Sequence, residues 1–371
     1  MEARRKAPEP PCFHWAQSSQ RPPARWIRTV PGLATRAQVP FAVAVDHRAD
    51  HALGAHVSVL SVINGQVVAA LGDGTVRFMA SGGHDAKSVA AHKGAILCGA
   101  RTLDGTSLLT GGDDGRVNCV TAEGATILSE GRKWIDAITA LADRGYAFCA
   151  GSMLTIQRPN GPRTEHKMPG PIGGMNRVSP AGLAVAHLGG VTLIDVSDKP
   201  KPQATLPWDG LHVAVTISPD RRFIVTGTYD GALHGWRIAD STDMQMGGYI
   251  SKPKSLSWSP RGNWLASSGA NRAVLWPFEG RNGPMGRQAT TLAPRRALVT
   301  SVVWHPKFDI VAIGYEDGAV MLAQLSNGRV LPVREPDGSA VTEMTFDGKG
   351  RSFACGTESG ALTICLLGDP S

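Results

Sequence analysis

One short pattern recurs eight times along the chain and sets the strongest limit on its fold. The clearest copy spans residues 223–238 and reads FIVTGTYDGALHGWRI: an apolar run, an Asp-Gly turn and a second, alternating run. This order is typical of a β-hairpin. Gly231 is expected to have a positive φ, which glycine adopts without steric cost. Because a single hairpin buries too little surface to be stable alone, the fold depends on the repetition.

The copies are evenly spaced. Seven further segments have the same order of apolar run, turn and second run. Those at 67–79, 108–120 and 310–322 have Asp-Gly, whereas those at 183–195 and 353–365 have Gly-Gly and Ser-Gly, and those at 147–157 and 264–276 are degraded copies without Asp-Gly. The eight turns fall at positions 74, 115, 153, 190, 231, 271, 318 and 360, which are 37 to 47 residues apart. A period near 40 residues is typical of the four-stranded blades of a β-propeller. We therefore predict an all-β propeller with eight blades, or with seven if a degraded copy forms no blade.

The end of the repeat array predicts how the ring closes. Each repeat adds a short strand before the hairpin and a looser strand after it, but the last copy ends near Leu367, after its third strand. A segment from the N-terminal side must then supply the fourth strand, and we expect it within residues 35–45. Closure of this kind removes exposed sheet edges. The propeller would occupy residues 41–371, with residues 1–40 as a separate arm.

The arm differs in composition from the rest of the chain. Residues 1–40 are rich in proline and carry seven Lys or Arg and two Glu, which is +5 of the total formal charge of +7. This composition is typical of a disordered segment. The near-neutral remainder argues against a nucleic-acid face on the propeller, because such faces concentrate Lys and Arg. Association with nucleic acid through the basic arm is kept as an alternative.

Cysteine usage and hydropathy bear on the compartment. None of the six cysteines forms a CxxC pair, and five of them fall in or beside predicted strands. We interpret them as small core residues in a reducing environment. No apolar run approaches the roughly 18 residues of a membrane span. Prolines follow the basic N-terminus where a signal peptide needs an apolar segment. We therefore expect a cytoplasmic protein with no membrane partner.

The hairpins resemble WD40 repeats. That pattern has two apolar residues, Ser/Thr-Gly, two residues, Asp-Gly and an alternating strand ending in Trp; the best matches are 224–236, 110–117 and 312–320. The chain thus resembles the WD40-repeat β-propeller family over residues 41–371, which implies a protein-binding scaffold. Residues 233–236 and 283–286 also resemble a bacterial group of WD40 proteins, which implies no activity. No Trp-Asp pair ends a third strand, so the family's buried His–Ser–Asp–Trp network is expected to be mostly absent.

Motifs for catalysis are missing from the sequence. It contains no GxxxxGK[ST], HExxH or GxSxG motif and no paired-cysteine metal spacing. The acidic stretch at 111–115 matches the hairpin turns of the other copies and is interpreted as one of them. An enzyme with a site at the axial channel is the alternative, with Glu343 and Asn176 as inward candidates, but two residues do not make a metal cage. We expect no catalytic residue, no metal and no cofactor.

The loops that join one repeat to the next hold the candidate binding residues. By repeat symmetry these loops lie on one face, and they carry basic side chains and two tryptophans. Trp and Arg are enriched among residues that dominate binding energy, and a cationic rim speeds encounter with an acidic partner. The alternative is that the charges are only solvated and both tryptophans pack under their own blades. We expect this rim to bind an acidic segment of a protein; the rim residues are Lys93, Arg132, Lys133, Trp134, Trp208, Lys252, Lys254, Arg295 and Arg296.

Overall fold

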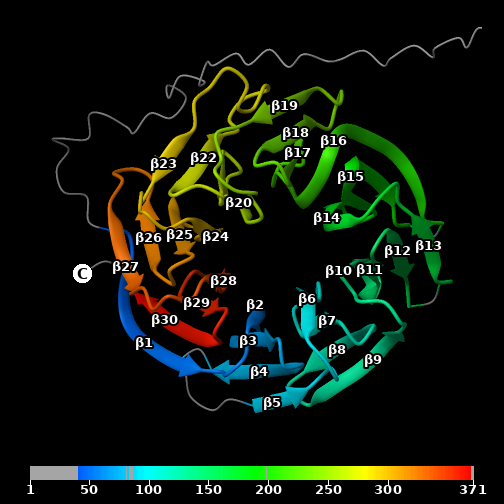
Figure 1. Cartoon of the computed structure of the whole chain (residues 1–371), viewed down its shortest axis with the longest axis horizontal. Helices are drawn as coiled ribbons and strands as arrows, with labels where there is room; N and C mark the ends of the chain where they lie inside the picture. The colour runs from blue at the N-terminus through cyan, green and yellow to red at the C-terminus, as the bar shows by residue number, and fades with distance from the viewer. Residues whose placement is uncertain (1–40, 81, 83–86, 160, 198, 369–371) are drawn as a thin grey trace, which may run out of the picture.

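The described part of the chain is a closed ring of antiparallel sheets around an open centre (Figure 1). The computed structural model describes residues 41–80, 82, 87–159, 161–197 and 199–368. Within these ranges there is no α-helix, and a short 3-10 helix, η1, covers Ala142–Arg144. No described helix therefore has the length and apolar character needed to cross a bilayer. The all-β propeller is confirmed, whereas the expected arm at residues 1–40 lies outside the described residues.

Five of the sheets each contain four strands that are consecutive along the chain. The first strand of each lies nearest the axis and the fourth lies at the outer edge (Figure 1). These strands are β2 (Val57–Ile63), β3 (Gln66–Leu71), β4 (Thr75–Ala80) and β5 (Lys87–Ala90); β6 (Ile96–Arg101), β7 (Leu108–Gly112), β8 (Arg116–Thr121) and β9 (Gly124–Glu130); β10 (Ala137–Ala140), β11 (Tyr146–Ala150), β12 (Met153–Gln157) and β13 (Thr164–Lys167); β20 (Leu256–Trp258), β21 (Trp264–Ser267), β22 (Ala273–Pro277) and β23 (Thr290–Leu292); β24 (Val299–Trp304), β25 (Ile310–Tyr315), β26 (Val320–Gln324) and β27 (Val330–Arg334).

A sixth sheet joins the two ends of the described chain. Its strands are β1 (Ala44–Ala52), β28 (Val341–Phe346), β29 (Ser352–Thr357) and β30 (Ala361–Gly368). β1 pairs antiparallel with β30 and is the outer strand of this sheet. Closure by an N-terminal strand is therefore confirmed, but the expected position, residues 35–45, was wrong except for its last two residues.

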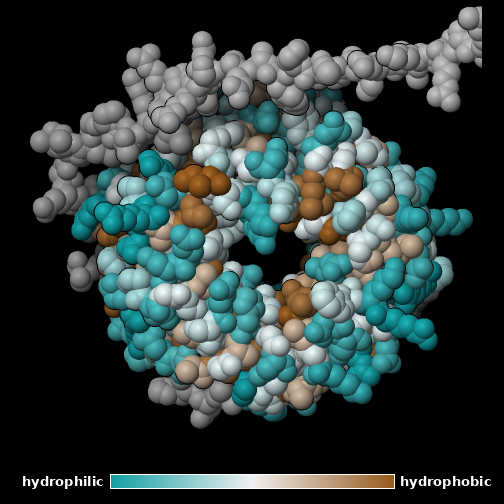
Figure 2. Space-filling model, in the orientation of Figure 1, coloured by the Kyte–Doolittle hydropathy of each residue, from teal (hydrophilic) through white to brown (hydrophobic). Residues whose placement is uncertain are grey.

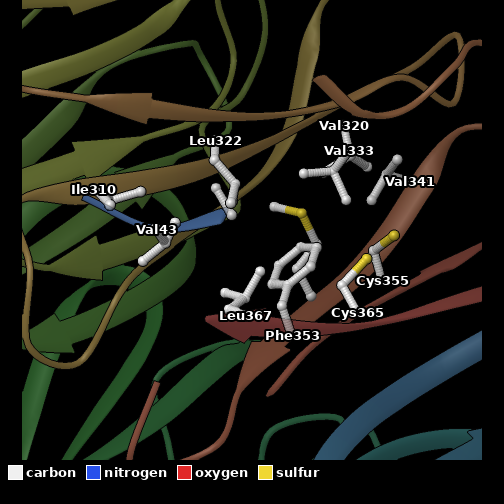
Figure 3. Close-up of a cluster of buried hydrophobic side chains, with 12 residues drawn as sticks. Val43, Ile310, Val320, Leu322, Val333, Val341, Phe353, Cys355, Cys365 and Leu367 are labelled. Atoms are coloured by element: carbon white, nitrogen blue, oxygen red, sulfur yellow. The ribbon is translucent and has the colours of Figure 1, made fainter. Parts of the chain in front are cut away.

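The position was predicted wrongly because an outer strand is exposed to solvent and has few apolar residues. β1 reads AVDHRADHA and is mostly exposed, so it gives no apolar signal in the sequence. The apolar run before it has a different role. Val43 is buried in the core between β25, β26 and β30, close to Ile310 and Leu367 (Figure 3).

The seventh sheet contains two of the predicted hairpins. Its six strands are β14 (Ile172–Ser179), β15 (Gly182–Asp195), β16 (Lys201–Ile217), β17 (Phe223–Thr228), β18 (Leu233–Arg237) and β19 (Asp243–Met246). β15 folds back on itself: the Val196 backbone NH donates to the Ala181 carbonyl at 2.8 Å. Fifteen extended residues would span about 50 Å, so the chain must reverse between them. Gly189 and Gly190, with φ of 94° and 134°, make that turn.

Counted by sheets, the ring has seven blades, the smaller of the two expected numbers. The cause is not the loss of a degraded copy, because the copies near 153 and 271 form the hairpins β11–β12 and β21–β22. Instead β16 runs unbroken from one repeat into the next. Its first part pairs with β15 and its last part pairs with β17.

The middle strands explain why the hairpins need one another. β17, β25 and β29 are buried along their whole length. Most of the apolar clusters are shared by neighbouring sheets, as in the one formed by β25 to β30 (Figure 3). The hairpin glycines have the expected conformation, with φ of 86° at Gly231. At Gly74 a Cβ would lie 2.5 Å from the carbonyl oxygens of His92 and Gly94 in the following loop, so only glycine fits there.

Candidate functional site

The loops between repeats and the hairpin turns lie together on one face of the ring, which we call the loop face. Backbone hydrogen bonds connect them: the Gly131 NH donates to the Gly115 carbonyl, and the Arg295 NH to that of Asn271, both at 2.9 Å. Eight of the rim residues lie in these loops, and Trp208 lies within β16. The ring leaves a hollow at its centre, and the surface around that hollow mixes hydrophilic and hydrophobic residues (Figure 2).

One loop, between β9 and β10, presents a fully accessible group of rim residues. Arg132, Lys133 and Trp134 are consecutive and exposed, and Trp134 keeps 63% of its surface accessible. Trp134 therefore does not pack under its own blade. No ion pair of Arg132 or Lys133 occurs within the described ranges. Lys93, Lys254 and Arg296 are exposed as well.

Two other rim residues contact aromatic side chains of the propeller. Trp208 stacks on the buried His234, with ring centroids 3.7 Å apart and planes 16° apart. The Lys252 ammonium lies 4.5 Å from the centre of the Tyr229 ring, a cation–π distance. For Trp208 the alternative of packing against the propeller is correct.

Arg295 is held by its own repeat. Its guanidinium donates to the Asp317 carboxylate at 2.9 Å and lies 5.2 Å from the centre of the Tyr315 ring. Burial raises the pKa of Tyr315. Arg295 thus stabilises the β25–β26 turn, whereas its neighbour Arg296 is exposed. The nine rim residues therefore share a face but not a single role.

Acidic side chains, which the sequence argument did not weigh, share this face with the basic ones. They come from the hairpin turns that the loops contact. Negatively and positively charged side chains therefore alternate on the loop face, which is not uniformly cationic. The signal was present in the Asp-Gly pairs, because the repeat places these turns beside the loops that carry the basic residues. The acidic residues of the hairpin turns are Asp73, Asp113, Asp114, Asp230, Glu316, Asp317 and Glu358.

The axial end of the loop face contains a cavity of about 680 Å³. The inner strands β20, β24, β28 and β2, from four successive sheets, form its walls. Glu343 on β28 lines this cavity, and burial raises its pKa to about 8. Asn176 lines a different cavity of about 250 Å³ and donates to the Val215 carbonyl at 3.4 Å. The two inward candidates are therefore not brought together, and no described cluster of three His, Cys, Asp or Glu could hold a metal.

Family models match the second half of this ring. The model described as "WD domain, G-beta repeat" matches residues 201–237 and 248–276, which include β16 to β18 and β20 to β22. The model described as "Anaphase-promoting complex subunit 4 WD40 domain" matches residues 302–368, up to the end of β30. The chain is a WD40-repeat β-propeller. No curated protein is significantly similar to it.

The WD40 hydrogen-bond network is better preserved than expected in one repeat. His92 Nδ1 lies 2.9 Å from Asp114 Oδ1, and His92 Nε2 lies 2.9 Å from Thr110 Oγ1. Asn118 on β8, not a tryptophan, lies beside the same ring, and its Nδ2 lies 3.3 Å from His92 Nε2. Burial alone would raise the pKa of Asp114, but hydrogen bonds from His92 and from two backbone NH groups lower it overall. These hydrogen bonds hold the β5–β6 loop, which contains Lys93, against the β7–β8 turn.

A second WD40 repeat uses tyrosine in place of histidine. The Tyr249 hydroxyl lies 2.6 Å from Ser267 Oγ and accepts from Trp276 Nε1 at 2.8 Å. Ser267 Oγ in turn donates to the Val274 carbonyl at 3.1 Å. The four-residue network is complete in neither repeat, as the missing Trp-Asp pairs predicted, but three of its positions are connected by hydrogen bonds here. Ser267 and Trp276, at the spacing of the repeat, were the available signal.

Proposed function

We propose that this WD40 propeller is a non-catalytic scaffold that docks an acidic segment of a protein partner on the loop face. WD40 propellers commonly bind protein partners. The observation that carries the proposal is the exposed group Arg132, Lys133 and Trp134. We further propose a cytoplasmic location, which imaging of a fluorescent fusion tests.

The chemistry of this group favours an acidic peptide. Trp134 offers a large apolar surface that would leave water on binding, and buried tryptophans are among the strongest contributors at interfaces. Arg132 and Lys133 lie next to it and have no intramolecular ion pair in the described chain, so a carboxylate of the partner need not displace one. Opposite charges also raise the association rate.

The test compares charge reversal on the two faces. The partner is first identified by affinity purification and mass spectrometry, and its affinity is then measured for Arg132→Glu/Lys133→Glu. The matched control is Arg261→Glu/Lys307→Glu, an equal charge change at exposed turns between first and second strands, on the opposite face. We expect at least a tenfold loss for the loop-face pair and little change for the control. Equal effects of both pairs, or none, would contradict the proposal.

A second variant separates charge from apolar contact. Trp134→Ala should weaken binding by increasing the dissociation rate, since the lost contact forms only in the bound state. Arg295→Glu is not suitable for this test. It would place a carboxylate against Asp317 and disturb the β25–β26 turn for reasons unrelated to binding.

A further inference from the structure

We propose that a small cavity on the face opposite the loop face binds a phosphoryl group through the side chains of Arg177, Arg221 and Ser179. The cavity has a volume of about 250 Å³ and lies where β14 and β16 end. β14 contributes Arg177 and Ser179 to its lining, and the β16–β17 turn contributes Arg221. Because the turns between first and second strands lie on the face opposite the loop face, this proposal is independent of the docking function proposed above.

The first support is that both arginines lack partners. Arg177 Nε is buried and has no hydrogen-bond partner in the part of the chain that the structure describes. Neither the Arg177 nor the Arg221 guanidinium forms an ion pair or a hydrogen bond with another described residue. A buried donor without an acceptor is costly to keep, and an oxyanion in the cavity would accept from it.

The second support is that the carboxylate next to Arg221 in the chain already has partners. Asp220 accepts from Ser218 Oγ at 2.6 Å and from Arg222 Nε at 2.5 Å. Arg222 also donates to the Gly280 carbonyl at 2.8 Å. The β16–β17 turn therefore pairs Asp220 with Arg222 and leaves the positive charge of Arg221 without a counter-ion.

The third support is the chemistry of the lining. No carboxylate is among the described residues that line the cavity, and Ser179 Oγ makes no hydrogen bond with another described residue. Guanidinium groups stay charged at physiological pH and bind oxyanions in a bidentate manner. A phosphoryl group on an ester carries about −1.5 to −2 charges near pH 7 and has three acceptor oxygens. It therefore matches two arginines and one hydroxyl donor.

The volume limits the size of the ligand. At about 250 Å³ the cavity is smaller than the sites that enclose drug-sized ligands, which measure roughly 300–1,000 Å³. We therefore expect it to hold a phosphoryl group and the few atoms attached to it. A carboxylate is small enough to enter as well, but its single charge balances only one of the two arginines, so it should bind more weakly.

The experiment uses the full chain and four small probes in a chloride buffer. N-acetyl-O-phosphoserine amide and inorganic phosphate carry the proposed group, N-acetyl-aspartate amide carries a carboxylate, and N-acetyl-serine amide is neutral. Calorimetry measures the affinity, and the ¹H–¹⁵N signal of Arg177 Nε, assigned with Arg177→Lys, reports where the probe binds. We expect both phosphate probes to bind and to shift this signal, the aspartate probe to bind at least tenfold more weakly, and the serine probe not to bind.

Two variants test the role of the exposed arginine. Arg221→Gln should weaken binding of both phosphate probes at least tenfold, while its thermal unfolding shows an intact fold. The matched control is Arg351→Gln, because Arg351 is also exposed and also lies two residues before a buried phenylalanine, in the β28–β29 turn. This control should leave the affinity unchanged.

Several results would overturn the inference. These are equal binding of the aspartate probe, an Arg177 Nε signal that stays unchanged at saturating phosphate, or equal effects of Arg221→Gln and Arg351→Gln. Tighter binding of the phosphoserine probe would assign the group to a phosphorylated molecule, and tighter binding of inorganic phosphate would assign it to the free ion; both support a phosphoryl site. The docking proposal fails separately, because Arg132→Glu/Lys133→Glu should abolish partner docking and leave the affinity for phosphate unchanged.

Discussion

At the scale of single residues, one diverged repeat keeps a complete hydrogen-bond chain, although other buried polar atoms of the described chain, such as Trp304 Nε1 and Ser352 Oγ, have no hydrogen-bond partner. Tyr249 shows this most clearly: it receives the Trp276 NH and donates to Ser267. A buried donor without an acceptor costs about 1–3 kcal/mol. A replacement such as His by Tyr is therefore tolerated when the hydrogen-bond chain stays complete.

Removing the Tyr249 hydroxyl should show how much this chain of hydrogen bonds stabilises the fold. Tyr249→Phe is expected to lower the free energy of unfolding by about 1–3 kcal/mol, because the NH of the partly buried Trp276 loses its acceptor. Urea unfolding measures the effect. Tyr229→Phe is the control, since Tyr229 is 60% exposed and its loss should stay within about 0.5 kcal/mol. Equal effects of the two substitutions would show that the buried chain adds no stability.

The residue scale also marks the limit of prediction for the site. The sequence allowed the face of the eight rim residues in loops to be predicted, because the repeat fixes which loops lie together, whereas Trp208 lies within β16. It did not allow the state of each side chain to be predicted. Arg295 and Arg296 are adjacent in sequence, yet only the first reaches an aspartate across the β25–β26 turn. Such a contact depends on how a loop approaches a turn, which periodicity does not describe.

At the scale of elements, β1 is the strand whose position the sequence did not predict. Hairpin strands were found because burial on both faces makes them apolar, as in β17 and β25. An outer strand faces solvent and carries charge, so β1 looks like a loop. Arg48 and Asp50 pair within it, and Asp50 accepts from Thr363 of β30 at 2.6 Å. Polar contacts thus fix a strand that apolar packing does not specify.

Removing β1 should open the ring. A chain that starts at residue 53 exposes the edge of β30, and exposed strand edges promote association with other chains. We expect a lower Tm and larger species in light scattering after gel filtration, compared with a chain that starts at residue 41. Addition of a peptide of residues 41–52 should partly restore both properties. Monomers with an unchanged Tm would show that closure by β1 adds little.

At the scale of the whole molecule, the period of the repeat was enough to predict a ring, because forty-residue sheets with two apolar faces can cover them only with one another. The fused sheet of β14 to β19 could not be predicted in this way. The periodicity counts turns, and all eight turns are present. Whether two neighbouring sheets share hydrogen bonds depends on the path of β16 between them, for which the sequence has no repeat signal.

The whole propeller should lose stability in mild acid. Burial lowers the pKa of His212, His234 and His305, that of His234 to about 4 despite the nearby Asp243. The unfolded chain takes up these protons near pH 6.5, before the folded chain does, so stability is greatest above pH 6.5 and declines toward pH 4. For His234 alone the loss between pH 7 and pH 5 is roughly 1–2 kcal/mol.

Thermal unfolding at several pH values checks this expectation. His234→Gln cannot be protonated and should reduce the dependence of Tm on pH between 7 and 5. His47→Gln is the control, because His47 is exposed on β1. A pH profile of His234→Gln that matches the wild type would contradict the assignment.

The pairing of β1 with β30 also determines when the ring can close during synthesis. The partner of β1 is the last strand of the described chain, about 300 residues later. A ribosome adds roughly 5–20 residues per second, so the first strand waits about 15–60 s for its neighbour to be made. Until then every nascent copy is an open arc with two free ends. A message that stops before β30 can yield only such an arc, because β1 has no partner strand until β30 is made.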